Sequence, residues 1–402
     1  MRTHTKQPKI PVTELEHSAF CKPGDELPAK TLLEEKAVNV QWQDIPIEYL
    51  HCSVEELDAR IGRAKQELGD SVTILGHHYQ REEVIKYTDF QGDSFLLSQK
   101  AARLPNADYI IFCGVHFMAE TACILCESRQ KVILPNITAG CSMADMAPMD
   151  DVDDAWEDLQ DVLADHGGIV PVTYMNSIAS IKALCGRTGG AVCTSSNAVA
   201  VMDWALNQSR RVLFLPDQHL GRNTGLELGL STDDMVVWNP FKHLGGNTEE
   251  QLRGAKLILW QGHCAVHKRF SVKQIEMARE RYPDITVLVH PECTMETVQE
   301  ADLVGSTEFI RKTINEAPQG SKWAVGTEIS LVNRLALENP NKVVFCLDPV
   351  VCPCSTMYRI HPAYLLWVLE GLLNGKVINQ VTVPDDIRQD AQIALERMLA
   401  LS

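Results

Sequence analysis

Short apolar runs recur along most of the 402-residue chain, and each is followed by a polar or glycine-rich turn and then by a stretch with helical periodicity. Strands that are buried on both faces and alternate with helices form parallel sheets covered by layers of helices. The pattern therefore predicts an α/β fold. The runs are Val72–Leu75, Tyr109–Phe112, Lys131–Leu134, Ile169–Val172, Arg211–Leu215, Lys256–Trp260, Thr286–Val289 and Lys342–Phe345.

The residues that follow these runs are of three kinds, which recur in order. Because parallel sheets bind ligands beyond the carboxyl ends of their strands, residues in these positions would reach a common centre. The recurrence predicts a triplicated α/β unit in which each copy contributes one group of each kind. Rings come first (His77, Tyr79, Tyr174, His290), hydroxyls second (Ser195, Ser306, Thr307, with Ser94 on a helix in the first set), and cysteines third (Cys141, Cys264, Cys354).

The length also favours several domains, because 402 residues exceed what one hydrophobic core usually holds. We expect three pseudo-symmetric, three-layer αβα domains with short parallel sheets around a central active site. Their predicted bounds are 41–148, joined by C-terminal helices from 355–402, then 149–268 and 269–354. Residues 1–40 have little periodicity, which indicates a loosely attached N-terminal extension.

Charge and hydropathy narrow the choice of partners and compartment. The net charge of −16 disfavours nucleic acid and anionic membrane surfaces as partners. The N-terminus lacks the apolar core of a signal peptide, and no later run reaches the about 18 apolar residues of a membrane span. We therefore expect a cytoplasmic protein, in which most of the thirteen cysteines are reduced and pack as small hydrophobes.

Three cysteines have a different interpretation. Structural zinc sites usually take their ligands as close pairs, whereas Cys141, Cys264 and Cys354 lie far apart in the sequence. Single thiolates from three domains fit an iron–sulfur cluster better, and three ligands would leave one iron open for catalysis. Cys141 and Cys354 are also predicted to open helices, where the N–H groups and the helix dipole favour a thiolate.

Other candidate ligands are weaker. Cys123 and Cys126 have helical spacing and are expected to pack, and the acidic stretch 150–161 is expected to be the solvated face of a helix. Cys352 is either a spectator or a redox partner. His263 and His267 flank Cys264 and could hold zinc, but the glutamate of the usual helical zinc motif is absent.

The absence of three common motifs argues against several enzyme classes. The chain has no Gly-x-Gly-x-x-Gly after a strand, no phosphate-binding Gly-x-x-x-x-Gly-Lys-Ser/Thr loop and no Gly-x-Ser-x-Gly elbow. The sequence therefore disfavours three enzyme classes: dinucleotide oxidoreductases, nucleotide hydrolases and serine hydrolases. The polar strand-end residues instead suit a small oxyacid, with donors for carboxylate or phosphate oxygens and with Tyr79, Tyr174 and Glu292 able to move protons.

Taken together, these motifs resemble the quinolinate synthase family over about residues 70–375. The resemblance rests on the three cysteines in order and on Gly76-His77-His78-Tyr79-Gln80, Gly92-Asp93-Ser94, Phe117-Met118-Ala119-Glu120-Thr121-Ala122, Tyr174-Met175-Asn176-Ser177, Cys193-Thr194-Ser195-Ser196-Asn197-Ala198, His290-Pro291-Glu292-Cys293 and Gly305-Ser306-Thr307.

The resemblance implies a transferase of NAD biosynthesis that condenses iminoaspartate with dihydroxyacetone phosphate, releasing quinolinate, phosphate and water. It also implies a 4Fe-4S cluster on Cys141, Cys264 and Cys354, and we expect transient contact with the enzyme that supplies iminoaspartate. By position, Tyr79, Tyr174, Glu292 and His77 would be catalytic, and the substrate-binding residues would be His77, Ser94, Tyr174, Asn176, Ser195, His290, Glu292, Ser306 and Thr307.

Two other functions use the same cysteines and stay open at this point. One is an iron–sulfur or zinc protein that senses redox state without turnover, which would have no need for Tyr79, Tyr174 and Glu292. The other is a cluster-dependent hydro-lyase of a different pathway.

Overall fold

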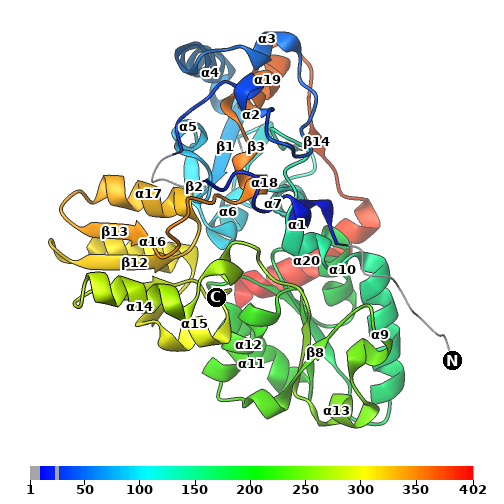
Figure 1. The fold of residues 1–402 in the computed structure, drawn as a ribbon. Coiled ribbons are helices and arrows are strands. Elements are labelled where there is room, and N and C mark those ends of the chain that lie inside the picture. The colour runs from blue at the N-terminus through cyan, green and yellow to red at the C-terminus, as the bar shows by residue number, and fades with distance from the viewer. Residues whose placement is uncertain (1–9, 23–26, 105, 402) are drawn as a thin grey trace.

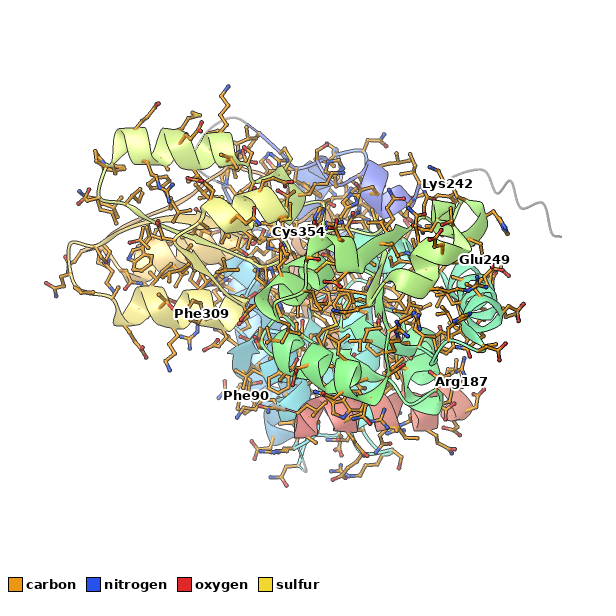
Figure 2. All side chains as sticks on the ribbon, turned by 90° about the horizontal axis from the view of Figure 1, so that it is seen from below. Phe90, Arg187, Lys242, Glu249, Phe309 and Cys354 are labelled. Atoms are coloured by element: carbon orange, nitrogen blue, oxygen red, sulfur yellow. A yellow bond between two sulfur atoms is a disulfide. The ribbon has the colours of Figure 1, made fainter. Side chains whose placement is uncertain are left out.

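The computed structural model describes residues 10–22, 27–104 and 106–401. Within these residues the strands form three separate sheets, each flanked by helices, and the three units meet around a centre (Figure 1). All eight apolar runs contain strands, so the predicted α/β class is confirmed. Figure 2 places Cys354 near the middle of the molecule, whereas Arg187, Lys242 and Glu249 lie toward its edge.

The first unit has a five-stranded sheet in the order β14-β4-β3-β1-β2, in which only β14 is antiparallel to its neighbour. The strands are β1 (Val72–His77), β2 (Phe90–Gly92), β3 (Tyr109–Cys113), β4 (Lys131–Ile133) and β14 (Gln380–Val381). The associated helices are α3 (Ile47–Leu50), α4 (Val54–Leu68), α5 (Glu82–Ile85), α6 (Ser94–Ala101), α7 (His116–Leu125) and α19 (Pro362–Leu373), and 3₁₀ turn η1 (Gly69–Ser71) precedes β1.

The second unit has the order β6-β5-β7-β9-β8, and all its strand pairs are parallel. The strands are β5 (Val170–Tyr174), β6 (Ala191–Cys193), β7 (Val212–Leu215), β8 (Met235–Trp238) and β9 (Leu257–Trp260). Its helices are α8 (Ser142–Asp145), α9 (Met149–Leu163), α10 (Ala179–Arg187), α11 (Ala198–Gln208), α12 (Gln218–Glu227) and α13 (Glu249–Gly254), with 3₁₀ turns η2 (Thr232–Asp234), η3 (His243–Gly246) and η4 (His267–Arg269). The acidic stretch is the outer face of α9, as predicted, because its apolar residues are buried.

The third unit has a four-stranded parallel sheet in the order β11-β10-β12-β13. The strands are β10 (Thr286–Val289), β11 (Leu303–Val304), β12 (Lys322–Gly326) and β13 (Val343–Cys346), and the helices are α14 (Val272–Arg281), α15 (Met295–Glu300), α16 (Thr307–Glu316) and α17 (Ile329–Glu338). When β8 and β14 are left out, each sheet has four strands in the same spatial order. If the strands of each unit are numbered along the chain, that order is second, first, third, fourth. The predicted triplication is therefore confirmed.

The C-terminal segment joins the units. It begins with α18 (Ser355–Tyr358), continues through α19 and β14 in the first unit, and ends in α20 (Asp385–Ala400), which packs along α10 of the second unit (Figure 1). The two helices approach so closely that a Cβ on Gly186 would lie 1.8 Å from the carbonyl oxygen of Asp390. Glycine is therefore required at this position.

The N-terminal extension is not loosely attached, so that prediction is wrong for residues 10–22 and 27–40. Leu32, on α2 (Leu32–Glu35), is fully buried, and the buried carboxylate of Glu35 pairs with Arg81 at 2.7 Å. The first helix, α1 (Val12–Leu15), packs against α8. Residues 1–9 lie outside the described structure. Among the described helices none is both long and apolar enough to cross a membrane.

Candidate active site

Equivalent strand ends from the three sheets converge on one cavity. His77 ends β1, Tyr174 ends β5 and His290 follows β10, and these are the corresponding strands of the three sheets. The hydroxyl residues follow β2, β6 and β11, and the three cysteines follow β4, β9 and β13. The residues that line the cavity and were predicted for the site are His77, Tyr79, Ser94, Cys141, Tyr174, Asn176, Ser195, Cys264, His290, Glu292, Thr307 and Cys354.

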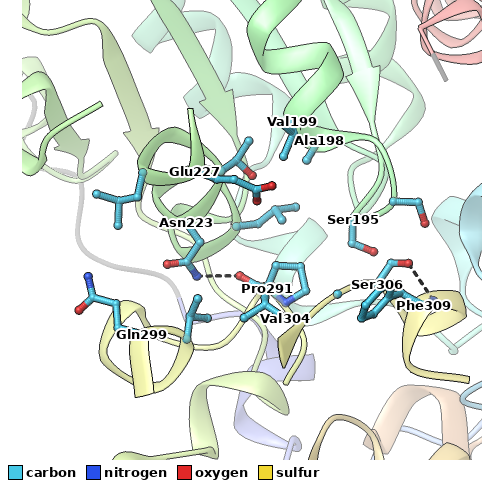
Figure 3. A pocket seen from close by; sticks show the side chains of 16 residues that line it. Ser195, Ala198, Val199, Asn223, Glu227, Pro291, Gln299, Val304, Ser306 and Phe309 are labelled. Carbon is cyan, nitrogen blue, oxygen red and sulfur yellow. Dashed lines mark hydrogen bonds between the residues drawn. The ribbon is translucent and has the colours of Figure 1, made fainter. Parts of the chain in front are cut away.

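Ser306 is the one predicted site residue that does not line this cavity. It is the N-cap of α16, where its side chain accepts a hydrogen bond from the N–H of Phe309 at 3.3 Å. It lines a neighbouring cavity between the second and third units, together with Pro291 and Val304 (Figure 3). Ser195 borders both cavities, so the two are adjacent.

A buried carboxylate links two units of the fold. The hydroxyl of Tyr174 donates to Oε1 of Glu292 at 2.6 Å, and Nδ1 of His267 lies 2.8 Å from Oε2. Burial opposes ionisation of Glu292, but the electrostatic influence of the neighbouring His267 and His290 rings and the hydrogen bonds from His267 and Tyr174 outweigh it and lower the pKa of the carboxyl group. The carboxylate is therefore ionised at neutral pH and is able to accept a proton.

Tyr79 lies on the other side of His267. Its hydroxyl is 2.7 Å from Oγ1 of Thr327 and accepts a hydrogen bond from Thr307 at 3.1 Å. Nε2 of His267 lies 3.1 Å from the same Thr327 oxygen. Burial and the charge of Glu292 raise the pKa of both Tyr79 and Tyr174, so both hydroxyls keep their protons. A continuous hydrogen-bonded chain thus runs from Tyr174 to Tyr79.

His77 and His290 present neutral rings to the cavity. The backbone N–H of Tyr79 donates to Nδ1 of His77 at 3.1 Å, and that of Glu292 donates to Nδ1 of His290 at 3.3 Å. Burial lowers the pKa of both rings, to about 3 for His290. With Nδ1 accepting, each ring carries its proton on Nε2, which makes it a hydrogen-bond donor.

Three thiols complete the cavity. Cys141, Cys264 and Cys354 are all free, and Cys141 and Cys354 are the N-cap residues of α8 and α18, which confirms that they open helices. Burial raises the pKa of all three thiols, so they stay protonated unless a cation binds them. The N–H groups that point at these sulfurs belong to Ala144, His267 and Met357, among others.

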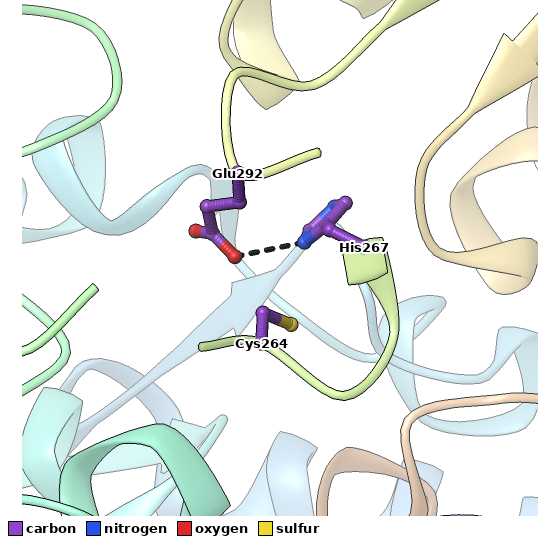
Figure 4. A group of neighbouring side chains, drawn as sticks. All are labelled: Cys264, His267 and Glu292. Atoms are coloured by element: carbon purple, nitrogen blue, oxygen red, sulfur yellow. Dashed lines mark hydrogen bonds and ion pairs between the residues drawn. The ribbon is translucent and has the colours of Figure 1, made fainter. Parts of the chain in front are cut away.

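One trio within the cavity has the spacing of a mononuclear metal site. Ligand atoms of Cys264, His267 and Glu292 lie within 4.8 Å of one another (Figure 4). The histidine and the carboxylate of this trio already hydrogen-bond each other, and they also contact Thr327 and Tyr174, respectively. The free thiols of Cys141 and Cys354 belong to the same cavity but lie outside the trio.

The remaining sequence candidates fall away from the cavity, with one correction. Cys126 packs in the core and Cys123 packs against it, as predicted. Cys352 forms a disulfide with Cys21, and Cys21 is one of the cysteines that the sequence predicts to be reduced and to pack. Arg269 contacts both sulfurs, at 3.1 Å from Cys21 and 2.6 Å from Cys352. Cys21 and Cys352 are 331 residues apart in the sequence, and no local sequence pattern predicts that they pair.

Comparison with known proteins agrees with this arrangement. The family model described as quinolinate synthetase A protein matches residues 59–239 and 228–400, which together include every residue that lines the cavity and all three cysteines. The chain belongs to the quinolinate synthetase A family. It is 57% identical to the quinolinate synthase of Corynebacterium glutamicum over 359 residues, covering 89% of this chain and 91% of the relative. It is 52% identical to the quinolinate synthase of Herpetosiphon aurantiacus over 374 residues, covering 92% of this chain and 99% of the relative.

Proposed function

We propose that the protein is a quinolinate synthase, which condenses iminoaspartate with dihydroxyacetone phosphate and releases phosphate and two water molecules in NAD biosynthesis. One observation carries this proposal: in a member of this family, three free thiols and the hydrogen-bonded chain Tyr174–Glu292–His267 line the same cavity. A cytoplasmic setting and transient contact with the enzyme that supplies iminoaspartate belong to the same proposal.

The donor set suits a 4Fe-4S cluster held by Cys141, Cys264 and Cys354. All three thiols are free and partly buried, and backbone N–H groups point at the sulfurs, which stabilises thiolates once iron binds. Three thiolates satisfy three of the four irons. When bound, the cluster would supply a Lewis-acidic iron with an open position for a substrate oxygen.

Neutral donors would hold the two anionic substrates. His77 and His290 offer Nε2–H groups, and hydroxyls come from Ser94, Ser195 and Thr307. These groups bind carboxylate and phosphate oxygens without competing for a proton near neutral pH. The side-chain oxygen of Asn176 is buried without a hydrogen-bond partner, so it is available to accept from the imine N–H.

The proton-moving groups are arranged as a base and an acid. Glu292 is ionised and would remove the proton from a carbon next to the substrate carbonyl, as the isomerisation of a ketose phosphate requires. Tyr79 and Tyr174 keep their protons and would donate one to a departing hydroxyl. His267 contacts Glu292 on one side and Thr327 on the other, so it would hold the carboxylate in position between the two tyrosines.

The alternatives lose support from the same geometry. A redox sensor has no use for the chain from Tyr174 to Tyr79, which is assembled from all three units. A hydro-lyase of another pathway would need the acid and the base, but it would not need enough hydrogen-bond donors to bind two anionic substrates.

The decisive experiment is an oxygen-free assay of the purified protein after reconstitution with iron and sulfide. Iminoaspartate and dihydroxyacetone phosphate are added, and quinolinate and phosphate are measured by chromatography. Equal amounts of both products are expected. Absence of quinolinate from protein that carries a full complement of iron and sulfide would overturn the function. A colourless protein that contains one zinc would favour the Cys264, His267 and Glu292 trio instead.

A further inference from the structure

The segment 10–22, which we name the strap, crosses the outer side of all three cysteine-bearing loops. It includes α1 and ends at Lys22, which forms an isolated β-bridge with Val351. The family model begins at residue 59, so the strap lies outside the matched region. No strap residue lines the substrate cavity. The strap therefore contacts the cysteine loops from outside the substrate cavity.

The first contact is with the Cys141 loop. Oγ1 of Thr13 donates a 2.6 Å hydrogen bond to Asp145, the last residue of the short helix that begins after Cys141. Gly140, which precedes the cysteine, lies so close to the strap that a Cβ there would be 3.5 Å from the methyl group of Thr13. The strap thus lies next to the residue beside the proposed ligand.

The second contact is with the Cys264 loop. Oε1 of Glu14 lies 3.1 Å from Nε2 of His263, the residue that precedes Cys264. Both side chains are largely buried, with exposed fractions of 16% and 17%. A largely buried carboxylate is held in place by its hydrogen-bond partner, so this contact fixes the strap to the loop.

The third group of contacts is with the Cys354 loop. The carboxylate of Glu16 pairs with Arg359, which follows α18 and is almost fully buried. The ring of Phe20 packs on Tyr358, the last residue of α18, with ring centroids 4.9 Å apart. Cys21 is joined to Cys352, two residues before Cys354. One end of the strap is therefore tied to this loop by covalent and non-covalent bonds.

We propose that the strap is a cover that holds the three cysteine loops together and limits access of solvent to the cluster. The inference rests on the proposed cluster, because a cover over three protonated thiols would have nothing to retain. Its physical basis is simple. Each loop alone can open outward by a local fluctuation, but one segment bonded to all three makes their opening a single event.

Two variants loosen the strap without touching the cavity. Glu14→Ala removes the contact with His263, and Phe20→Ala removes the packing on Tyr358. Leu15→Ala is the matched control, because Leu15 lies on the same short helix and is 66% exposed. The reconstituted proteins are mixed anaerobically with a ferrous-iron chelator, and the decay of the cluster's visible absorption is followed in each.

Iron should leave Glu14→Ala and Phe20→Ala about tenfold faster than the unsubstituted protein, which corresponds to about 1.4 kcal/mol less favourable closure. Leu15→Ala should match the unsubstituted protein. Hydrogen exchange of the metal-free proteins gives a second readout, in which peptides containing Cys141, Cys264 and Cys354 should all exchange faster in the milder variant Glu14→Gln. If the strap made only local contacts, a change in it would loosen one cysteine loop. Faster exchange in all three loops would therefore show that the strap holds them together.

The outcomes separate this inference from the proposed function. Suppose that the unsubstituted protein binds its cluster and makes quinolinate, yet Glu14→Ala and Phe20→Ala release iron at the unsubstituted rate and Glu14→Gln exchanges hydrogen at the unsubstituted rate. The strap is then not a cover, and the enzyme assignment stands. If the unsubstituted protein binds no cluster at all, the proposed function fails and the cover fails with it.

Discussion

The hydroxyl of Tyr174 and the carboxylate of Glu292 are joined by a 2.6 Å hydrogen bond, although one residue ends a strand of the second unit and the other follows a strand of the third. Tyr79, at the far end of the same chain of contacts, comes from the first unit. The proposed acid and base are therefore brought together only when the three units meet. Triplication of one α/β unit explains how similar strand ends supply different chemical groups to one centre.

The first prediction concerns Glu292. Glu292→Gln keeps the shape of the side chain but removes its ability to accept a proton, so kcat should fall about 10²- to 10⁴-fold. Cluster content should be unchanged, because the residue is not one of the three thiols. Quinolinate formation and the visible absorption of the same reconstituted sample are measured together.

Glu300→Gln is the control for this change, since Glu300 pairs with Arg279 on the surface of the same unit. It should retain full activity. Normal turnover by Glu292→Gln would remove the carboxylate from the mechanism, whereas loss of the cluster in that variant would show that Glu292 acts on the metal site.

The second prediction concerns His267, which positions the carboxylate of Glu292 at 2.8 Å. His267→Gln should lower kcat about tenfold to a hundredfold with little change in KM, because a base displaced by about 1 Å loses up to about 10²-fold in rate. It should also shift the acidic limb of the pH profile of kcat upward, since one hydrogen bond to the ionised carboxylate is lost. His243→Gln, in η3, is the control. An unchanged pH profile would exclude the positioning role.

Most of the cavity could be predicted from the sequence because strand ends are marked locally. A short apolar run followed by a polar residue shows where a strand stops, and parallel sheets bring those stops together. His77, Tyr174 and His290 were found in this way. Thr327 was missed because β12, which precedes it, was not among the recognised runs. Ser306 has the expected position in the chain, but its side chain caps α16 and does not line the cavity.

The role of His267 and the packing of the strap could not be predicted from local patterns. His267 begins a 3₁₀ turn, and its partners Glu292 and Thr327 are 25 and 60 residues away. The extension looked loose because its few apolar residues show no periodicity. Its attachment rests on single long-range contacts, such as Glu16 with Arg359, which are 343 residues apart.

The third prediction concerns the cluster ligands. Cys141→Ser, Cys264→Ser and Cys354→Ser should each lose bound iron and sulfide, because a serine hydroxyl is a poor ligand for iron in this setting. Cys123→Ser, on α7, and Cys126→Ser, at its C-cap, are matched controls and should keep the full complement. Iron, sulfide and visible absorption are measured after identical anaerobic reconstitution. A full cluster in any of the first three variants would exclude that cysteine as a ligand.

The fourth prediction concerns stability in acid and tests the buried histidine His361, the N-cap of α19. Its Nδ1 accepts from the N–H of Ala363 at 3.0 Å, and its Nε2 lies 2.9 Å from the carbonyl oxygen of Lys30, so the ring is neutral in the fold. Burial, assisted by the charge of Arg81, lowers its pKa to about 3. In the unfolded chain the ring takes up a proton below its ordinary pKa of about 6.5.

Between about pH 6.5 and pH 3 the unfolded state therefore binds one more proton at this ring than the folded state does, and the free energy of unfolding falls as the pH falls. The contribution of one such ring is at most about 1.4 kcal/mol per pH unit. His361→Asn keeps an acceptor for the helix cap but has no ring to protonate. Urea unfolding between pH 4.5 and pH 7.5 should show a shallower dependence on pH for this variant, and an unchanged one for the exposed control His51→Asn. Equal slopes for His361→Asn and the unsubstituted protein would mean that the His361 ring is already protonated in the fold.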